Sequence, residues 1–505
     1  MERVVMITTM VKLRGRALPR TAVVVALLAS ALLCSGCVRT RPAQPEIVAP
    51  PSWSAAGPDT VQSPTGDLSQ WWTRLGDPVL SDLIAQALKK NTSLRTARAN
   101  LREARAERNL AAANRFPTVT GTVSGSGSKS NSAGGSTGNA VSAELDASWD
   151  PDVFGAKGQA LRAADADLAT SAADLQTAQV SLVAEVATDY VDLRSYQARL
   201  EIARRNEASQ AETLQLTEWR AQAGLVSSID VEQARSNLEQ TRATIPTLET
   251  SAAQSKHELS VLLGLSPAAL NTQLAATAPI PSAPDTLMVG IPAETLRQRP
   301  DVRAAEKKIV AETARLWQKD AARYPTFSLS GSFILEQLLG GTAVGVVTGS
   351  TFTSLTANTT TTESGLGSIT QTFFDRGRIR QQIEIQNAVQ EHAVISYEST
   401  VLTALKDVEN ALVSFQNSRQ RLQALNQASD AARNAAQLAH NRYSAGLIDF
   451  QTVLDTERTA LTLEDSVAQT QADRTTALIQ LYKALGGGWQ ADAAIATPAK
   501  QGNPT

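Results

Sequence analysis

Cysteine and aromatic residues are scarce in this sequence. Its 505 residues include two cysteines, Cys34 and Cys37, and only 4% of the chain is aromatic. Both cysteines lie in or next to an N-terminal segment with the pattern of an export signal, so the mature body can form no internal disulfide bond. The small aromatic fraction argues against one large globular core, and the Ala, Gln, Leu, Arg and Glu content is typical of long helices.

Charge of one sign and metal-ligating residues are also missing. The 47 Lys and Arg nearly balance the 49 Asp and Glu, for a formal net charge of −2, so we predict no nucleic-acid partner. The three histidines, His257, His392 and His440, have no second ligand at helical spacing, so we predict no metal site. Because the chain also lacks a nucleotide-binding motif and a catalytic constellation, we predict no cofactor and no enzymatic activity.

Beyond the N-terminus the chain has no apolar run of 18 residues, so we predict no transmembrane helix. Residues 1–36 predict a signal peptide, because basic residues precede an apolar run, 21–33, that is too short to span a bilayer. The segment 33–37, LCSGC, resembles a lipoprotein signal box with Cys37 as the acylated first residue. The alternative is a plain secretory signal with Cys37 incidental. Residues 37–66 carry six prolines and predict an extended linker.

Two stretches without proline or internal glycine predict very long helices. Residues 158–220 would form a helix of roughly 95 Å, and a second helical pattern returns to about Leu263. The same arrangement recurs over 378–485. Apolar residues at heptad spacing predict packing along these arms. We therefore expect two long antiparallel helical hairpins, 158–263 and 378–485, which reverse at residues 223–226 and 445–447.

Alternating polar and apolar residues predict two β-hairpins, 117–150 and 326–374, each containing a loop rich in glycine, serine or threonine. In the second hairpin we expect the Gly/Thr-rich loop to run to about Gly365 and a weaker strand to follow as far as Phe373-Phe374. The four strands would have one apolar and one polar face, which is typical of an outer-membrane barrel. Four strands do not close a barrel, so copies of the chain must share one: two copies would give 8 strands and three would give 12. Ordinary half-buried strands of a soluble sheet are the alternative.

The chain also contains an internal repeat of about 210–220 residues. Arg115-Phe-Pro117 matches Arg323-Tyr-Pro325, and Arg220-Ala-Gln-Ala-Gly-Leu225 matches Arg442-Tyr-Ser-Ala-Gly-Leu447. Each half reads as helix, β-hairpin and long helical hairpin. We predict a first structural repeat at 67–285, a second at 286–488 and a C-terminal tail at 489–505.

Several stretches resemble one known family in order and spacing. They are Trp71-Trp72 with Asp77-Pro78, Leu296 with Arg299-Pro-Asp-Val-Arg-Ala-Ala-Glu306, Phe373-Phe-Asp-Arg-Gly377, and Arg442-Tyr-Ser-Ala-Gly-Leu-Ile-Asp-Phe-Gln451 with Leu454-Asp455. The chain resembles the TolC-like outer membrane factors of tripartite efflux pumps, specifically the NodT-type lipoprotein branch. The resemblance runs from Trp71 to about Gly488.

This resemblance implies a mainly α-helical chain that completes a membrane β-barrel of 12 strands and an α-barrel of 12 helices as a homotrimer, with four of each from every copy. It implies a channel in the outer membrane, lipid-anchored and extending into the periplasm. Its partners would be a periplasmic adaptor protein and an inner-membrane transporter, which we expect to be of the RND type. Exported compounds in the family are drugs, dyes, solvents or metal ions.

Site residues follow from the resemblance and from the strand pattern. The family's adaptor-contact motifs fall on Gly224, Leu225, Val226 and Ser227 at the first tip, and on Gly446, Leu447 and Ile448 at the second. Its periplasmic gate positions fall on Arg442, Tyr443, Gln451, Asp455 and Asp230, although Asp230 could instead cap its own helix. On the polar strand face, Glu144, Asp146 and Asp150 would make the barrel lumen acidic. A non-conducting, lipid-anchored coiled-coil scaffold is the alternative function.

Overall fold

The structure, a computed structural model, describes residues 50–54, 60–62, 68–129, 137–284, 287–289, 292–347 and 350–489. The predicted signal peptide, the predicted acylation site Cys37 and nearly all of the C-terminal tail lie outside the described residues. Most of the predicted linker, 37–66, lies outside them as well.

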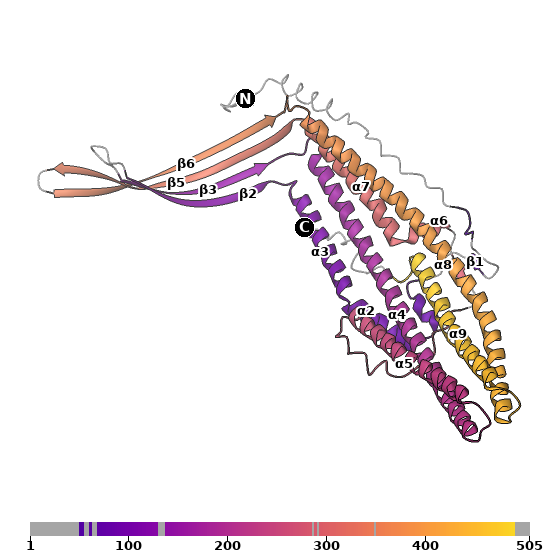
Figure 1. Ribbon diagram of the computed structural model, residues 1–505. Coiled ribbons are helices and arrows are strands. Elements are labelled where there is room, and N and C mark those ends of the chain that lie inside the picture. Colours follow the sequence, from indigo (N-terminus) through magenta and orange to yellow (C-terminus); the bar gives the residue numbers. More distant parts are fainter. Residues whose placement is uncertain are drawn as a thin grey trace. The chain divides into compact units, whose positions relative to one another are not determined.

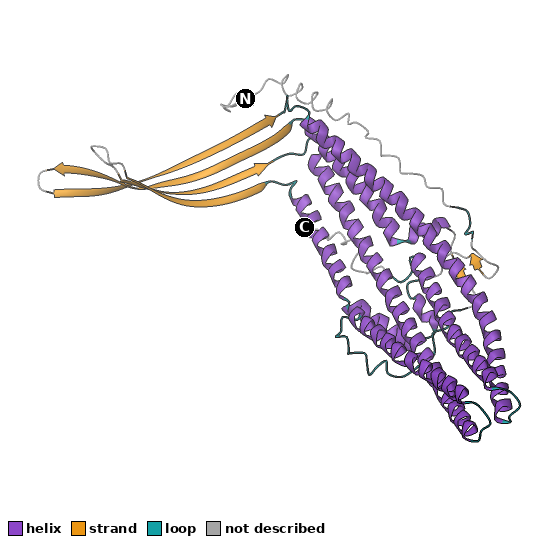
Figure 2. Cartoon of the chain, viewed as in Figure 1, coloured by secondary structure: helices purple, strands orange, loops and turns teal. Residues whose placement is uncertain are grey.

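Helices dominate the described chain, and the strands form one four-stranded and one two-stranded sheet (Figure 1, Figure 2). In chain order the elements are β1 (Thr60–Gln62), the 3-10 helix η1 (Trp71–Leu75), α2 (Pro78–Lys90), α3 (Thr92–Ala113), β2 (Thr118–Lys129), β3 (Thr137–Trp149), α4 (Ala156–Gln222), α5 (Ser228–Leu262), β4 (Leu287–Val289), α6 (Pro292–Gln298), α7 (Pro300–Asp320), the 3-10 helix η2 (Ala321–Arg323), β5 (Thr326–Val347), β6 (Ser350–Thr370), α8 (Arg378–Ser444) and α9 (Phe450–Ala484). Contacts divide the chain into two units, whose described residues are 104–129, 137–167, 308–347 and 350–394 in one, and the remainder in the other.

The long helices match the prediction closely. Helices α4 and α8 each have 67 residues, and their return arms α5 and α9 each have 35. Helix α4 begins where the Asp152 carboxylate accepts hydrogen bonds from the backbone N–H groups of Lys157 and Gly158, at 2.9 and 2.6 Å, so free donors of the first turn are satisfied. Among the described residues, no helix combines the length and apolarity needed to cross a membrane.

The first unit contains the four-stranded antiparallel sheet, in the order β2-β3-β5-β6. Its register places Leu145 beside Phe333 and Gly121 on the apolar side, and Glu144 beside Ile334 and Thr122 on the other. The strand pattern of the sequence therefore reappears as two chemically different faces. Hydroxyl pairs link neighbouring strands on the polar side, as at Ser332–Ser364 (2.7 Å).

The second unit holds the main apolar core, where the Trp71 ring stacks on Tyr482 of α9 with centroids 5.2 Å apart. The Tyr190 hydroxyl donates to Asp77 at 2.7 Å. The other carboxylate oxygen of Asp77 accepts from the backbone of Val79 at 2.8 Å, which caps α2. The two motif positions predicted near the start of the body, Trp71 and Asp77, thus anchor short helices to the long ones.

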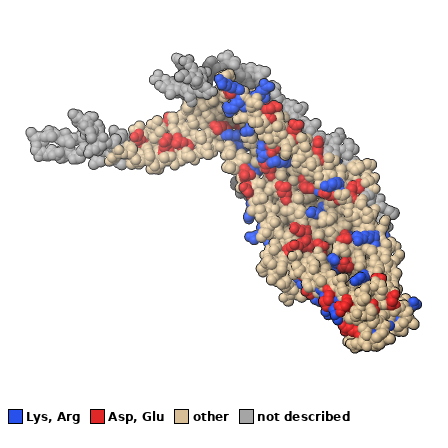
Figure 3. Space-filling model, in the orientation of Figure 1, with Lys and Arg blue, Asp and Glu red and all other residues tan. Residues whose placement is uncertain are grey.

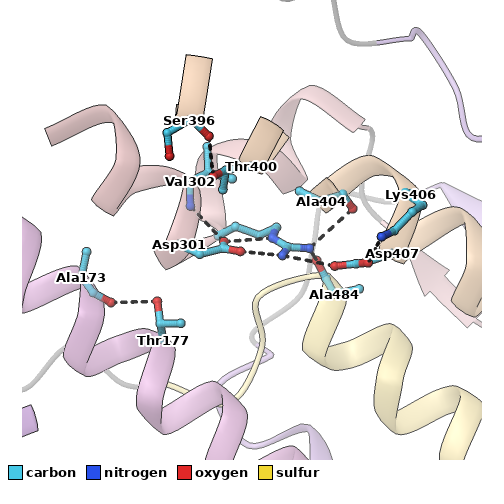
Figure 4. Close-up of polar contacts among 11 residues, drawn as sticks. Ala173, Thr177, Asp301, Val302, Ser396, Thr400, Ala404, Lys406, Asp407 and Ala484 are labelled. Atoms are coloured by element: carbon cyan, nitrogen blue, oxygen red, sulfur yellow. Dashed lines mark hydrogen bonds and ion pairs between the residues drawn. The ribbon is translucent and has the colours of Figure 1, made fainter. Parts of the chain in front are cut away.

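Arg299 joins the start of α7 to the second long hairpin. Figure 4 shows Asp301, Asp407 and Ala484, which come together here from three helices. The Arg299 guanidinium donates to the Asp301 carboxylate at 3.0 and 2.6 Å and to the backbone oxygen of Ala484, the last residue of α9, at 2.9 Å. Asp407 of α8 lies 3.7 Å away. Burial alone would raise the pKa of Asp301, but the hydrogen bonds from Arg299 hold it below its ordinary value. This motif arginine therefore has a structural role at the end of α9.

Two sequence predictions need correction. The stretch predicted as a Gly/Thr-rich loop up to about Gly365 belongs largely to β5 and β6, and the strand predicted to reach Phe373 ends at Thr370. The backbone of β5 pairs with that of β6 along both strands, except for a register shift between Leu339 and Thr342. Within the predicted linker 37–66, residues Thr60–Gln62 form β1, which pairs in parallel with β4. Both errors concern backbone pairing between segments, which local composition does not reveal.

Candidate functional site

The first long hairpin reverses in a tight turn after α4. The Gly224 N–H donates to the Ala221 oxygen and the Leu225 N–H to the Arg220 oxygen, both at 2.9 Å. This crossed pair is a Schellman motif, which needs a left-handed residue at the glycine position. Gly224 has φ +74°, and no atom of the residues that the structure describes lies within 4 Å of where a Cβ would stand. Backbone conformation, not lack of space, therefore explains the glycine.

The second long hairpin reverses in the same way after α8. The Gly446 N–H donates to the Tyr443 oxygen and the Leu447 N–H to the Arg442 oxygen, again both at 2.9 Å. Gly446 has φ +76°. The side chains of Leu225 and Leu447 are 68% and 74% exposed, so each turn presents an apolar side chain to the outside.

The return arms begin with different caps. At the first tip, the Ser227 N–H donates to the Asp230 carboxylate at 3.0 Å and the Asp230 N–H donates to the Ser227 hydroxyl at 3.4 Å, a capping box. Asp230 therefore helps to cap α5, which is the alternative role that its position near the helix start predicts. At the second tip Asp449 accepts from the Thr452 N–H at 2.9 Å. Val226 and Ile448 are both half-buried beside their turns.

The predicted gate positions of the second hairpin separate into exposed and buried residues. Arg442, Gln451 and Asp455 are exposed, and the Gln451 amide donates to the Asp455 carboxylate at 3.0 Å. Tyr443 is only 1% exposed and its ring centroid lies 5.9 Å from that of Phe450. Tyr443 is thus part of the apolar cluster of the tip, whereas the other three present polar groups at its surface.

A row of polar contacts joins the two hairpins beside the tips, and we call it the tip seam. It consists of Thr213, Thr217 and Arg220 on α4, Tyr443 on α8 and Glu457 on α9. The Arg220 guanidinium donates to the backbone oxygen of Tyr443 and lies over its ring, 4.4 Å from the centroid. The Thr217 hydroxyl is 3.2 Å from the Tyr443 hydroxyl, and the Thr213 hydroxyl donates to Glu457 at 2.9 Å. The seam fixes one hairpin against the other.

Sequence reasoning missed four of the five seam residues. The sequence signal that could have identified Glu457 is its spacing along the helix. Glu457 follows Val453 by four positions and precedes Ala460 by three, and all three are buried on α9. A carboxylate at such a heptad core position is unusual, because burial without a charged partner is unfavourable. Burial raises the pKa of Glu457 to about 7, and the hydrogen bond from Thr213 partly opposes this rise.

Further acidic residues lie along the long helices of the second unit. Burial raises the pKa of Asp189 to about 7, and the nearby charges of Glu258, Glu185 and Asp192 add to the rise. In the described part of the chain, no group of three or more possible ligands has a geometry that could hold a metal ion.

The predicted lumen residues occupy two kinds of position. Glu144 and Asp146 lie in β3 on the polar side of the sheet, half-buried, and acidic side chains gather over the strands (Figure 3). Glu336 of β5 shares that side beside Ser142 and was not predicted. Asp150 lies just beyond the end of β3, with its carboxylate 3.5 Å from the Lys157 ammonium. The acidic character of this face therefore rests on Glu144, Asp146 and Glu336.

The family model for outer membrane efflux proteins matches residues 83–265 and 291–487. The chain belongs to this family. It is an outer-membrane channel component of an efflux system, a transport protein, as the resemblance in the sequence implied. The two matched segments together cover most of the chain, and each includes one of the long helical hairpins.

Relatives of this efflux protein match along nearly its whole length. The pyoverdine export outer membrane protein OpmQ of Pseudomonas putida is 32% identical over 463 residues, which cover 88% of this chain and 94% of OpmQ. Nodulation protein T of Rhizobium leguminosarum biovar trifolii is 28% identical over 464 residues, covering 91% and 96%. The solved outer-membrane channel OprN superposes with a TM-score of 0.77 at 35% identity, covering 90% of this chain and all of OprN.

Proposed function

We propose that three copies of this chain form one tunnel from the periplasm to the exterior. Four strands and the long helices of each copy would build the 12-stranded barrel and the 12-helix barrel. The tunnel would work with a periplasmic adaptor and an RND-type inner-membrane transporter, which would supply the energy. Cys37 would carry the lipid anchor in the outer membrane.

The main support for this proposal is the pair of outer strands of the four-stranded sheet. Strands β2 and β6 each pair with one neighbour among the described residues, although they contain 12 and 21 residues. Long unpaired edges are unfavourable in water because they invite aggregation, and in lipid because each free backbone group is left unsatisfied. Pairing β2 of one copy with β6 of the next would satisfy both edges and repeat until the ring closes.

The apolar side of the sheet supports a lipid environment. Val119, Val123, Leu145, Phe333 and Ile369 are 41–78% exposed, although all five are large apolar side chains. The same strands carry Ser, Thr and acidic residues on their other side. An apolar outside and a polar inside is the arrangement of outer-membrane barrels. Glu144 and Asp146 would then line the lumen.

The tips would form the periplasmic end of the tunnel. We assign adaptor contact to Gly224, Leu225, Val226, Ser227, Gly446, Leu447 and Ile448. The two turns each carry one exposed leucine. These leucines support the assignment, since exposed apolar side chains on projecting turns offer a docking surface. We assign the gate to Arg442, Tyr443, Gln451, Asp455 and Asp230. Of these, Asp455 and Gln451 form an exposed hydrogen-bonded pair on one surface of α9.

Cysteine crosslinking between copies tests the proposal. Val119→Cys or Val123→Cys on β2 combined with Ile369→Cys on β6 should give covalent trimers after oxidation, because the mature body has no cysteine beyond Cys37. Val141→Cys with Ile369→Cys is the matched control, since Val141 lies on the inner strand β3. The same trimers should conduct ions in planar bilayers. A non-conducting monomer or dimer would overturn the channel and favour the scaffold.

A further inference from the structure

Glu457 has an unusual position for a carboxylate. It is 8% exposed on α9, where Val453 and Leu454 belong to the apolar cluster of the tip and Ala460 is buried as well. Its hydrogen-bond partner is the Thr213 hydroxyl of α4, at 2.9 Å. Through this one contact, a titratable group on the second hairpin meets the first hairpin at the tip.

The charged groups around Glu457 do not neutralise it. On its own helix, Arg458 donates to Asn237 at 2.9 Å and Glu464 accepts from Arg433 at 2.9 Å. Arg220 is engaged with Tyr443. The neighbouring stretches of α4, α5, α8 and α9 also carry Glu207, Glu212, Glu218, Asp230, Glu232, Arg235, Glu239, Arg242, His440, Arg442 and Asp455. Within the described residues, none of these groups forms an ion pair with Glu457.

The seam around Glu457 is also incompletely hydrogen-bonded. Gln210 lies one turn before Thr213 on the same face of α4 and is 3% exposed, yet neither polar atom of its amide has a hydrogen-bond partner among the described residues. Buried polar atoms without partners weaken a packed interface, because separation of the helices would return them to water. The Gln210 amide therefore lowers the stability of the helix packing beside Thr213.

The two protonation states of Glu457 have different consequences for this contact. A neutral carboxyl can accept the Thr213 hydrogen bond without placing a charge among apolar side chains. An ionised carboxylate in the same place keeps a single hydrogen bond and loses its hydration. Burial accordingly raises the pKa of the group to about 7.

We propose that Glu457 is a proton-controlled latch of the tip. Its neutral carboxyl holds α9 against α4, and its ionisation loosens the packing of one hairpin on the other. The link from this loosening to channel opening rests on the proposed function, whereas the loosening itself does not.

The direction and size of the effect follow from proton linkage. The packed state has a raised pKa, so it is favoured at low pH and loses that advantage as the pH rises from the ordinary value of 4.5 toward about 7. With an ordinary pKa in the opened state, the ratio of opened to packed tips should rise about tenfold between pH 6 and pH 8.

Hydrogen exchange on the full-length protein measures this ratio directly. After correction for intrinsic exchange rates, amides of the seam segments 213–220 and 450–457 should lose about tenfold protection between pH 6 and pH 8. Glu457→Gln should show equal protection at both pH values. Glu249→Gln is the matched control, since Glu249 is an exposed helical glutamate paired with Arg204, and it should behave as the wild type. An unchanged pH response in Glu457→Gln would overturn the latch.

A second variant keeps the test decisive if Glu457→Gln does not assemble. Thr213→Val removes the hydrogen bond that opposes the raised pKa, so the loss of protection should move to higher pH; no movement would overturn the assignment.

Planar-bilayer conductance over the same pH range separates the two proposals. A pH-dependent exchange in a non-conducting chain would reject the channel and keep the latch. Conductance and exchange that are both independent of pH would reject the latch and keep the channel.

Discussion

Replacing Arg220 by alanine should loosen the tip seam and favour the opened tip. The substitution removes a charged hydrogen bond to the Tyr443 backbone oxygen and a cation–π contact at 4.4 Å. Such a hydrogen bond contributes about 1.5–3 kcal/mol and a cation–π contact about 0.5–2 kcal/mol. The buried Nε of Arg220 has no hydrogen-bond partner in the described part of the chain, and losing this unpaired group with the side chain offsets about 1 kcal/mol of the loss. We expect a net loss of about 2 kcal/mol, or a roughly 30-fold shift toward the opened tip.

Single-channel recording in planar bilayers would measure this shift as a longer open time, and cells carrying the variant should become sensitive to a large antibiotic that the closed channel excludes. Arg235→Ala is the matched control, because Arg235 is about half exposed and its ion pairs with Glu218 and Glu232 are at the surface. Exposed pairs of this kind contribute less than about 1 kcal/mol. Equal effects of Arg220→Ala and Arg235→Ala would refute the assignment of the seam.

Three further results are expected. Glu144→Gln with Asp146→Asn should lower the cation preference of the channel, measured from reversal potentials in a salt gradient; an unchanged preference would place these residues outside the lumen. Gly224→Ala and Gly446→Ala should each destabilise their turn by about 1–2 kcal/mol through the left-handed backbone, seen as faster hydrogen exchange at the tip. Burial raises the pKa of Asp189 from 3.8 to about 7, so stability should fall as the pH rises through that interval. Asp189→Asn should therefore show a smaller decrease in thermal midpoint between pH 4 and pH 8 than the wild type.

The long helices could be predicted from the sequence because their signals are local. A stretch without proline or internal glycine predicted 158–220, and α4 extends only two residues beyond it at each end. The turn at Gly224 could also be predicted from the sequence, since a left-handed position selects for glycine. The lengths of the strands were harder to predict. Residues 340–347 and 350–365 are rich in Gly and Thr, and they belong to strands because a neighbouring strand pairs with them.

The tip seam illustrates why the rest of the site was not predicted. Thr217 and Tyr443 are 226 positions apart in the sequence, and Thr213 and Glu457 are 244 apart. Neither contact follows from the periodicity of either helix, because periodicity shows which side of a helix is buried and not which helix covers it. The buried carboxylate at a core position was visible in the spacing, whereas its partner became visible only with the packing of the two hairpins.

The two reversals have the same backbone but different side chains. Both hairpins have arms of 67 and 35 residues, and both turns have the same crossed hydrogen bonds. Three copies assembled as proposed would therefore present six ends of nearly identical shape, in two alternating chemical types. A partner that recognises the shape of the turn would have six equivalent binding positions, whereas one that recognises Ser227 or Asp449 beside it would have three. The stoichiometry of the periplasmic complex is thus a direct measure of which feature its partner recognises.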